Sequence, residues 1–237
     1  AAIGRARRLA EIARQPFQWG LAASRLLLLR AAEGDAAAHE LARSLEDGIR
    51  AHHFVVYTPY VHTGLGLLAL GAGNAAEAVA QLERARDWAE AAGYAVPGIL
   101  SWPWDLAEAY LQLGETEAAR HTLERFRPIA LRTGTATAIA IVHRLDGLLA
   151  AANQCEAHFV AALEQHARGA NSFELGRTQL HYGRRIRRMG HRRRAQQQLE
   201  QAQQTFRALG ASSWLRQATD ELAALGVRVG PRSDGPL

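Results

Sequence analysis

Residues 173–226 read FELGRTQLHYGRRIRRMGHRRRAQQQLEQAQQTFRALGASSWLRQATDELAALG, and this stretch decides the fold. Glycines at positions 190 and 210 divide it into three pieces, each as long as a helix. In the middle piece the apolar residues recur at steps of four, three, four and three, which places them on one helix face. They are Ala195, Leu199, Ala202, Phe206 and Leu209. The outer pieces carry similar stripes, so each helix needs neighbours that cover its apolar face.

The same apolar ladder recurs upstream with a period near forty residues. It follows Gly73, Gly114, Gln154 and Gly190, and the spacings between these anchors are 41, 40 and 36 residues. Such a period, built from two antiparallel helices, is typical of an α-solenoid. We therefore predict an all-α, TPR-like solenoid of about 12 antiparallel helices that forms a right-handed superhelix.

The predicted organisation is a single repeat domain over residues 1–226, followed by a linker at 227–237. An additional anchor is expected near Gly34, and residues 213–225 are expected to form a closing helix. Pro128 falls inside a predicted helix, where it removes a backbone hydrogen bond, so we expect a kink or break near Arg127.

Composition agrees with an all-α protein and narrows the functional classes. The chain has 237 residues, of which 48% are hydrophobic, and it is rich in strong helix formers. No apolar run approaches the roughly 18 residues needed to cross a bilayer, and the single cysteine excludes an internal disulfide, so we expect a cytoplasmic protein. The chain begins with Ala and its only methionine is Met189, which indicates a piece of a longer protein.

No motif in the sequence predicts catalysis, a metal or a cofactor. The glycine-rich run 64–73 ends a predicted helix and lacks the GK[ST] of a phosphate loop. Cys155 and His158 are three residues apart, but no second pair of ligands accompanies them. We expect a non-catalytic chain.

Eight arginines cluster in the deciding stretch, and Glu174 is the only acid in their sequence neighbourhood. Such a density is able to neutralise phosphates, but it is also typical of a solvated face whose arginine stems cover apolar surface, which is the interpretation we favour. An acidic partner domain is the next alternative. The arginines are Arg177, Arg184, Arg185, Arg187, Arg188, Arg192, Arg193 and Arg194.

Aromatic and hydrogen-bonding residues gather on the first helices of the predicted hairpins. In solenoids these helices tend to line the concave surface, where a peptide or a small organic ligand binds. The same residue types also pack at the seams between hairpins, and that alternative stays open. The candidates are Tyr57, Tyr60, His62, Trp102, Trp104, Tyr110, His143, Arg144 and His181.

The deciding stretch resembles the last repeat of the large ATP-binding regulators of the LuxR family, the MalT-like transcriptional activators. The resemblance rests on FELGRT at 173–178, YGR at 182–184, RMGHRRRA at 188–195, TFRALGA at 205–211, Trp214 and ELAALG at 221–226. It is specific over these residues and extends over the rest of the chain only at the level of the repeat.

The resemblance implies a three-part protein, in which this repeat domain lies between an ATP-binding switch domain and a helix-turn-helix domain. ATP and DNA would then contact those two domains and no residue of this chain. The repeat domain would receive a small-molecule inducer or a protein partner. Apart from the resemblance, the missing neighbours at both ends of the array favour end-to-end association into a homo-oligomer. The alternative is a TPR-type adaptor attached to another signalling protein, such as a nucleotide-binding or cyclase-linked one.

Overall fold

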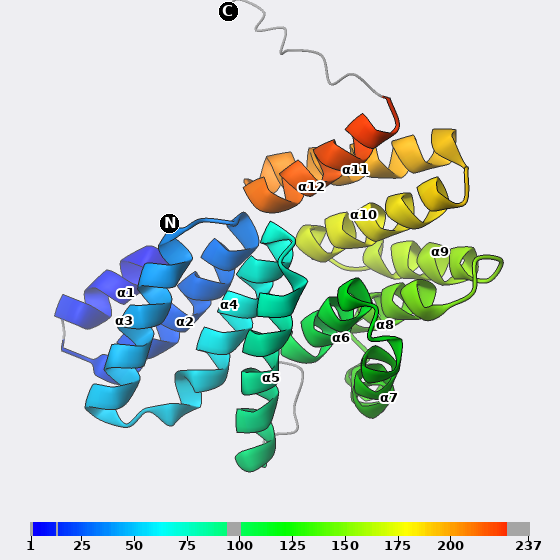
Figure 1. Ribbon diagram of the computed structural model, residues 1–237. Coiled ribbons are helices and arrows are strands. Elements are labelled where there is room, and N and C mark those ends of the chain that lie inside the picture. The colour runs from blue at the N-terminus through cyan, green and yellow to red at the C-terminus, as the bar shows by residue number, and fades with distance from the viewer. Residues whose placement is uncertain (1, 13, 94–100, 227–237) are drawn as a thin grey trace, which may run out of the picture.

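The structure is a computed structural model that describes residues 2–12, 14–93 and 101–226 (Figure 1). This part of the chain is all-helical and contains no strand, and a short 3-10 helix at Val55–Tyr57 precedes α4. The predicted linker at 227–237 lies outside the described residues. The α-helices are α1 (Ala2–Ile12), α2 (Pro16–Glu33), α3 (Ala37–His52), α4 (Thr58–Ala72), α5 (Ala75–Ala91), α6 (Trp102–Leu113), α7 (Thr116–Thr133), α8 (Ala136–Leu149), α9 (Cys155–His166), α10 (Ser172–Arg188), α11 (Arg192–Leu209) and α12 (Ser212–Ala224).

From α2 onward the helices pair into five consecutive hairpins, and α12 closes the array. The turns after α2, α4, α6 and α10 each contain a glycine with a left-handed φ between 75° and 87°. Only glycine adopts this conformation without strain, so the sequence sets the hairpin turns directly. The glycines are the predicted anchors Gly34, Gly73, Gly114 and Gly190. The turn after α8 is different, because Gln154 has a φ of −113°.

Glycines in the first helix of a hairpin allow the second helix to approach closely. A Cβ atom on Gly66 would lie 2.4 Å from Leu82, and one on Gly183 would lie 2.7 Å from Leu199. Each glycine stands seven residues before its anchor, and each leucine stands nine residues after it. These leucine side chains therefore pack directly against the backbone of the preceding helix.

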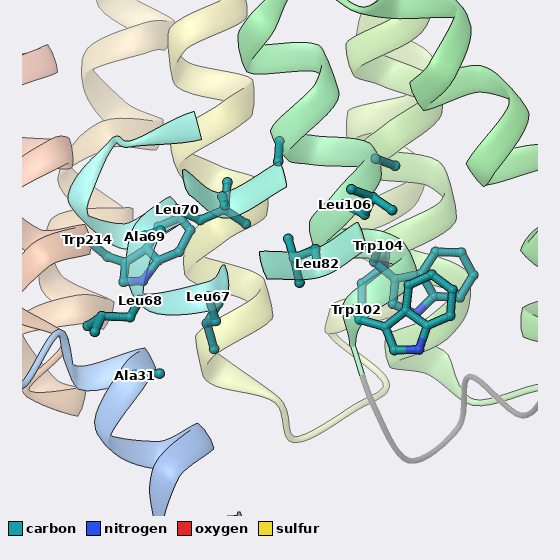
Figure 2. Close-up of a cluster of buried hydrophobic side chains, with 14 of the residues drawn as sticks. Ala31, Leu67, Leu68, Ala69, Leu70, Leu82, Trp102, Trp104, Leu106 and Trp214 are labelled. Atoms are coloured by element: carbon teal, nitrogen blue, oxygen red, sulfur yellow. The ribbon is translucent and has the colours of Figure 1, made fainter. Parts of the chain in front are cut away.

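The core runs through the first helices of the hairpins, with α4 near its centre. Figure 2 shows Leu67–Leu70 of α4 between Trp214 of α12 on one side and Leu82 and Leu106 on the other. Leu70, Leu82, Leu106 and Trp214 are fully buried. The first helices of the hairpins thus form a buried layer that the other helices enclose.

Helix α12 returns to the first half of the molecule. The side-chain amide of Gln217 donates to the carbonyl oxygens of Leu70 (3.0 Å) and Gly71 (2.7 Å) at the end of α4. The hydroxyl of Ser212 donates to the carbonyl oxygen of Glu33 at the end of α2 (2.9 Å). The bonds to Glu33 and Gly71 satisfy carbonyls that a helix leaves without partners at its C-terminus, whereas the carbonyl of Leu70 also accepts from the backbone N–H of Gly73. The last helix is therefore fastened to the first two hairpins.

Two further expectations concern single helices. The expected break near Arg127 does not occur, because α7 continues through Pro128 to Thr133. In a helix packed on both flanks, the tertiary contacts outweigh the single hydrogen bond that proline removes. In the described part of the chain, no helix combines the length and the hydropathy needed to cross a membrane.

Candidate functional site

The five aromatic candidates lie inside the helix layer and do not line an open surface. Their exposed fractions lie between 3% and 9%. Trp102 and Trp104 meet the ring of Phe126 edge-on, with ring centres 5.1 and 6.4 Å away. The hydroxyl of Tyr110 donates to Glu83 (2.7 Å) in the neighbouring hairpin. The five residues, Tyr57, Tyr60, Trp102, Trp104 and Tyr110, therefore occupy seams between helices.

The remaining candidates go to three different places. His62 is half-buried, and its Nδ1 lies 2.9 Å from Oε1 of Gln81 on α5. Arg144 and His181 enter one buried group of charged residues. His143, one residue before Arg144, lies instead beside His158 of α9. Of the nine predicted ligand-binding candidates, only Arg144 and His181 therefore lie together in one buried group of charged residues.

That site, called here the charge cluster, joins α6, α8 and α10 in the middle of the array. None of its side chains belongs to a residue more than 6% exposed. It contains three carboxylates, two guanidinium groups and one imidazole. The residues are Asp105 and Glu108 of α6, Arg144 of α8, and Glu174, Arg177 and His181 of α10.

Arg177 is the centre of the charge cluster. Its Nη1 lies 2.7 Å from Asp105 and 2.9 Å from Glu174, and its Nη2 lies 2.8 Å from Glu108. The guanidinium also lies 4.9 Å from the ring centre of Trp214 on α12, a cation–π distance. One side chain of the last full hairpin therefore contacts both α6 and the closing helix.

Arg144 and His181 complete the charge cluster around the acids. Nη1 of Arg144 donates to Glu174 (2.6 Å), and Nη2 lies 3.8 Å from Glu108. Nε2 of His181 lies 2.9 Å from the other oxygen of Glu108. Glu108 thus has three cationic or hydrogen-bonding partners and Glu174 has two, as buried carboxylates require.

Burial and ion pairing compete in setting the pKa values of the cluster. Burial raises the pKa of Glu108, but Arg177, His181 and Arg144 outweigh burial and hold it well below its usual range. For Asp105 burial is the stronger effect, and the pKa is raised despite the nearby Arg177. Burial also lowers the pKa of His181, against the pull of Glu108. At neutral pH the histidine is therefore uncharged.

His166 of α9 borders the charge cluster and responds to the same surroundings. Its Nε2 lies 3.0 Å from the hydroxyl of Thr178, and the residue is 5% exposed. Burial, followed by the positive charge of Arg144, lowers the pKa of His166 to about 4. The imidazole is uncharged at neutral pH, so its protonation opposes folding in mild acid.

Sequence reasoning missed Asp105 and Glu108 of the charge cluster because their partners are distant in the chain. Arg177 and Glu108 are 69 residues apart. A signal was present, since Asp105 and Glu108 stand between apolar and aromatic residues in WPWDLAEAY, where a solvated acid is out of place. A buried acid at such a position requires a cationic partner.

The arginines of the predicted basic patch do not form a continuous basic surface. Arg177 is buried, Arg184 and Arg187 both pair with Glu221 of α12, and Arg194 pairs with Glu156 of α9. Arg185 and Arg192 donate to the carbonyl oxygens of Ala150 and Leu225. Within residues 2–12, 14–93 and 101–226, the side chains of Arg188 and Arg193 form no ion pair or hydrogen bond, and both residues are exposed. The acids that oppose the patch come from neighbouring helices, beyond the Glu174 visible in the sequence.

An open cleft of about 480 Å³ lies among α1, α2 and α3. Its lining combines the indole of Trp19 with the charged or ionisable side chains of Arg7, Glu11, Arg14 and His52. Nε of Arg7 is buried without a hydrogen-bond partner in the described residues. A volume of this size suits a small organic ligand.

A scan against protein-family models finds no match to this chain, and a search of curated proteins finds no similar sequence.

Proposed function

We propose that this chain is the non-catalytic sensing and protein-interaction domain of a LuxR-family transcriptional regulator, and that it acts in the cytoplasm. Support comes from the resemblance of residues 173–226 to the last repeat of such regulators, together with the array of helical hairpins to which that segment belongs. In this proposal, ATP and DNA bind to other domains of the protein.

The main support for the proposal is the packing of α12 against the first two hairpins. In the family that the chain resembles, this segment precedes the DNA-binding domain. Here α12 is bonded to the carbonyl ends of α2 and α4 and covers the guanidinium of Arg177. A displacement of the first hairpins therefore moves the helix nearest to the proposed output domain.

The cleft among α1, α2 and α3 is the proposed place for an inducer. We prefer this cleft as the ligand site to the concave surface expected from the sequence, because the aromatic side chains expected on that surface are buried in the helix layer. Helix α2 contributes Trp19 to the cleft, and its far end accepts the hydrogen bond from Ser212. A ligand that shifts α2 thus acts on α12 through one rigid helix.

The test uses the whole gene with a transcriptional reporter at its own promoter. Arg7→Gln in the cleft and Gln217→Ala at the α12 contact are expected to abolish induction, while Gln197→Ala on the exposed face of α11 leaves it intact. Circular dichroism checks that the variants fold. Normal induction in both variants contradicts the proposal, as does a gene with no helix-turn-helix after codon 237.

The second candidate is a TPR-type adaptor attached to another signalling protein. Exposed apolar side chains of α1 favour it, since Leu9 is 66% and Ile12 is 79% exposed. An adaptor predicts a stable protein complex and no change of the reporter on any substitution in the cleft.

A further inference from the structure

Three metal-ligand side chains meet on the hairpin formed by α8 and α9. His143 and Asp146 are one turn apart on α8, so they project from the same helix face. His158 of α9 faces them across the hairpin, and one ligand atom from each residue lies within 4.8 Å of the others. The rings of the two histidines are inclined by 35°, with centres 6.5 Å apart.

The histidines are available for coordination. Nδ1 of His143 is buried and has no hydrogen-bond partner in the described part of the chain. All three residues are half-buried, which leaves a path for an ion. Cys155 is the other potential metal ligand near His158 in the sequence. It is fully buried, and its sulfur lies 3.8 Å from that of Met189. His158 therefore faces the α8 pair without the cysteine.

We propose that His143, Asp146 and His158 form a binding site for a divalent transition-metal ion, with Zn²⁺ as the best fit. Two imidazoles and one carboxylate are a ligand set that Zn²⁺ accepts, at bond lengths of about 2.0–2.2 Å. Such bonds require the ligand atoms to move from within 4.8 Å to roughly 3.3 Å of one another, so the three side chains have to rotate when the ion binds.

An adjoining cleft completes the coordination sphere. It has a volume of about 210 Å³, and Asp146 and His158 both line it. Water molecules in this cleft reach the open coordination position, as in zinc sites with three protein ligands. Gln154 and Glu124 also line the cleft and supply further oxygen atoms to the bound water.

Arg127 of α7 competes with the ion for Asp146. Its guanidinium donates to both carboxylate oxygens, at 2.8 and 2.5 Å. A divalent ion on the same carboxylate repels the guanidinium, so binding weakens the pair that joins α7 to α8. At the same time the ion links α8 to α9. The hairpin without a glycine turn is thus the one that the metal fastens.

The first experiment measures Zn²⁺ binding to the whole chain by isothermal titration calorimetry in a buffer that does not chelate metal. We expect saturable binding of one ion per chain. His143→Asn and His158→Asn are expected to weaken binding by about 10-fold or more, since the loss even of an outer-shell partner has an effect of that order. His39→Asn, at an exposed position on α3, is the matched control and should bind as the parent does.

Two further measurements keep the proposal falsifiable if a variant fails to fold. In the parent chain, Zn²⁺ should protect His143 and His158 from diethylpyrocarbonate and leave His39 reactive. Arg127→Gln should bind Zn²⁺ several-fold more tightly, because the competing cation is gone. The proposal is overturned by the absence of saturable binding in the parent, by equal losses in the His39 control, or by binding in Arg127→Gln that is no tighter than in the parent.

Discussion

Two seams between hairpins of the same array are built from different chemistry. Between α2 and α4, Leu27 packs so closely against Gly64 that a Cβ atom there would lie 2.7 Å from its side chain. Between α6 and α10, the guanidinium of Arg177 lies among three carboxylates. Both seams are enclosed, and both join the first helices of their hairpins.

The comparison separates stability from specificity. Apolar contact is non-directional and stabilises in proportion to the area buried. A buried ion pair gains only when each charge has its partners in place, so removal of one partner is costly. The seam of α2 and α4 therefore contributes stability to the array. The charge cluster requires one particular alignment of α6, α8 and α10, and it makes the free energy of unfolding depend on pH.

Loss of Arg177 should have the largest effect. Arg177→Met leaves the carboxylates of Asp105, Glu108 and Glu174 with Arg144 as the remaining arginine, and we expect the free energy of unfolding to fall by about 3–5 kcal/mol. Urea denaturation at pH 7 measures it. Adding Asp105→Asn and Glu108→Gln should recover part of the loss, since these remove the unpaired charge. A loss under about 1 kcal/mol means that the charge cluster contributes no such constraint.

The apolar seam should respond to truncation but not to pH. Leu27→Ala removes a fully buried side chain, and we expect a loss of about 3 kcal/mol. The loss should be the same at pH 7 and pH 5, because no titratable group faces Leu27 in its contact with Gly64. Urea titrations at both pH values test this. A loss that changes with pH would mean that the two seams are coupled.

Mild acid should weaken the ionic region specifically. His166 has a pKa of about 4 in the folded protein and an ordinary pKa of 6.5. Below pH 6.5 the unfolded chain therefore binds a proton that the folded protein does not, and the free energy of unfolding falls as the pH drops from 6.5 toward 4. The loss is on the order of 2 kcal/mol. His166→Gln should make the stability profile between pH 6.5 and 5 less steep, and His181, whose pKa burial also lowers, accounts for the slope that remains.

Below this window the glutamates act in the same direction. The lowered pKa values of Glu108 and Glu174 mean that their stabilisation is present above the ordinary value of 4.5 and is lost at lower pH. The raised pKa of Asp105 partly offsets this loss. If the His166→Gln profile falls as steeply as that of the parent between pH 6.5 and 5, His166 is not a titrating group in this window.

The smallest expected effect concerns close approach within a hairpin. Gly66→Ala places a methyl group 2.4 Å from Leu82, and the strain exceeds the gain in helix propensity by about 1 kcal/mol. Gly4→Ala in α1 meets no atom within 4 Å and should stabilise by up to about 1 kcal/mol. Thermal melts of the two variants should shift in opposite directions. A shift in the same direction would show that Leu82 yields without cost.

Local features of the sequence predicted the helices well. The division of residues 173–226 at Gly190 and Gly210 is confirmed, because α10 ends at Arg188, α11 ends at Leu209 and α12 begins at Ser212. Apolar periodicity and left-handed glycines act within a few residues, and a single sequence displays both. The handedness of the superhelix stays a prediction.

The candidate site was much less predictable, since it depends on packing between distant segments. Trp102 and Trp104 are buried because other helices of the array cover the first helices of the hairpins. No local sequence pattern shows how completely those helices are covered. Residue type alone placed Arg177 with the surface arginines, although its partners on α6 bury it. The triad of His143, Asp146 and His158 likewise arises only when α8 and α9 pair.

The seating of α12 also bears on the order in which the molecule assembles. An open array of repeats is able to fold from either end, because each repeat contacts only its neighbours. Ser212 and Glu33 are 179 residues apart, and Gln217 and Leu70 are 147 apart. During synthesis the carbonyl groups of Glu33 and Gly71 therefore find their hydrogen-bond donors only after α12 has been made. Such long-range contacts should slow folding relative to an array held together by neighbour contacts alone.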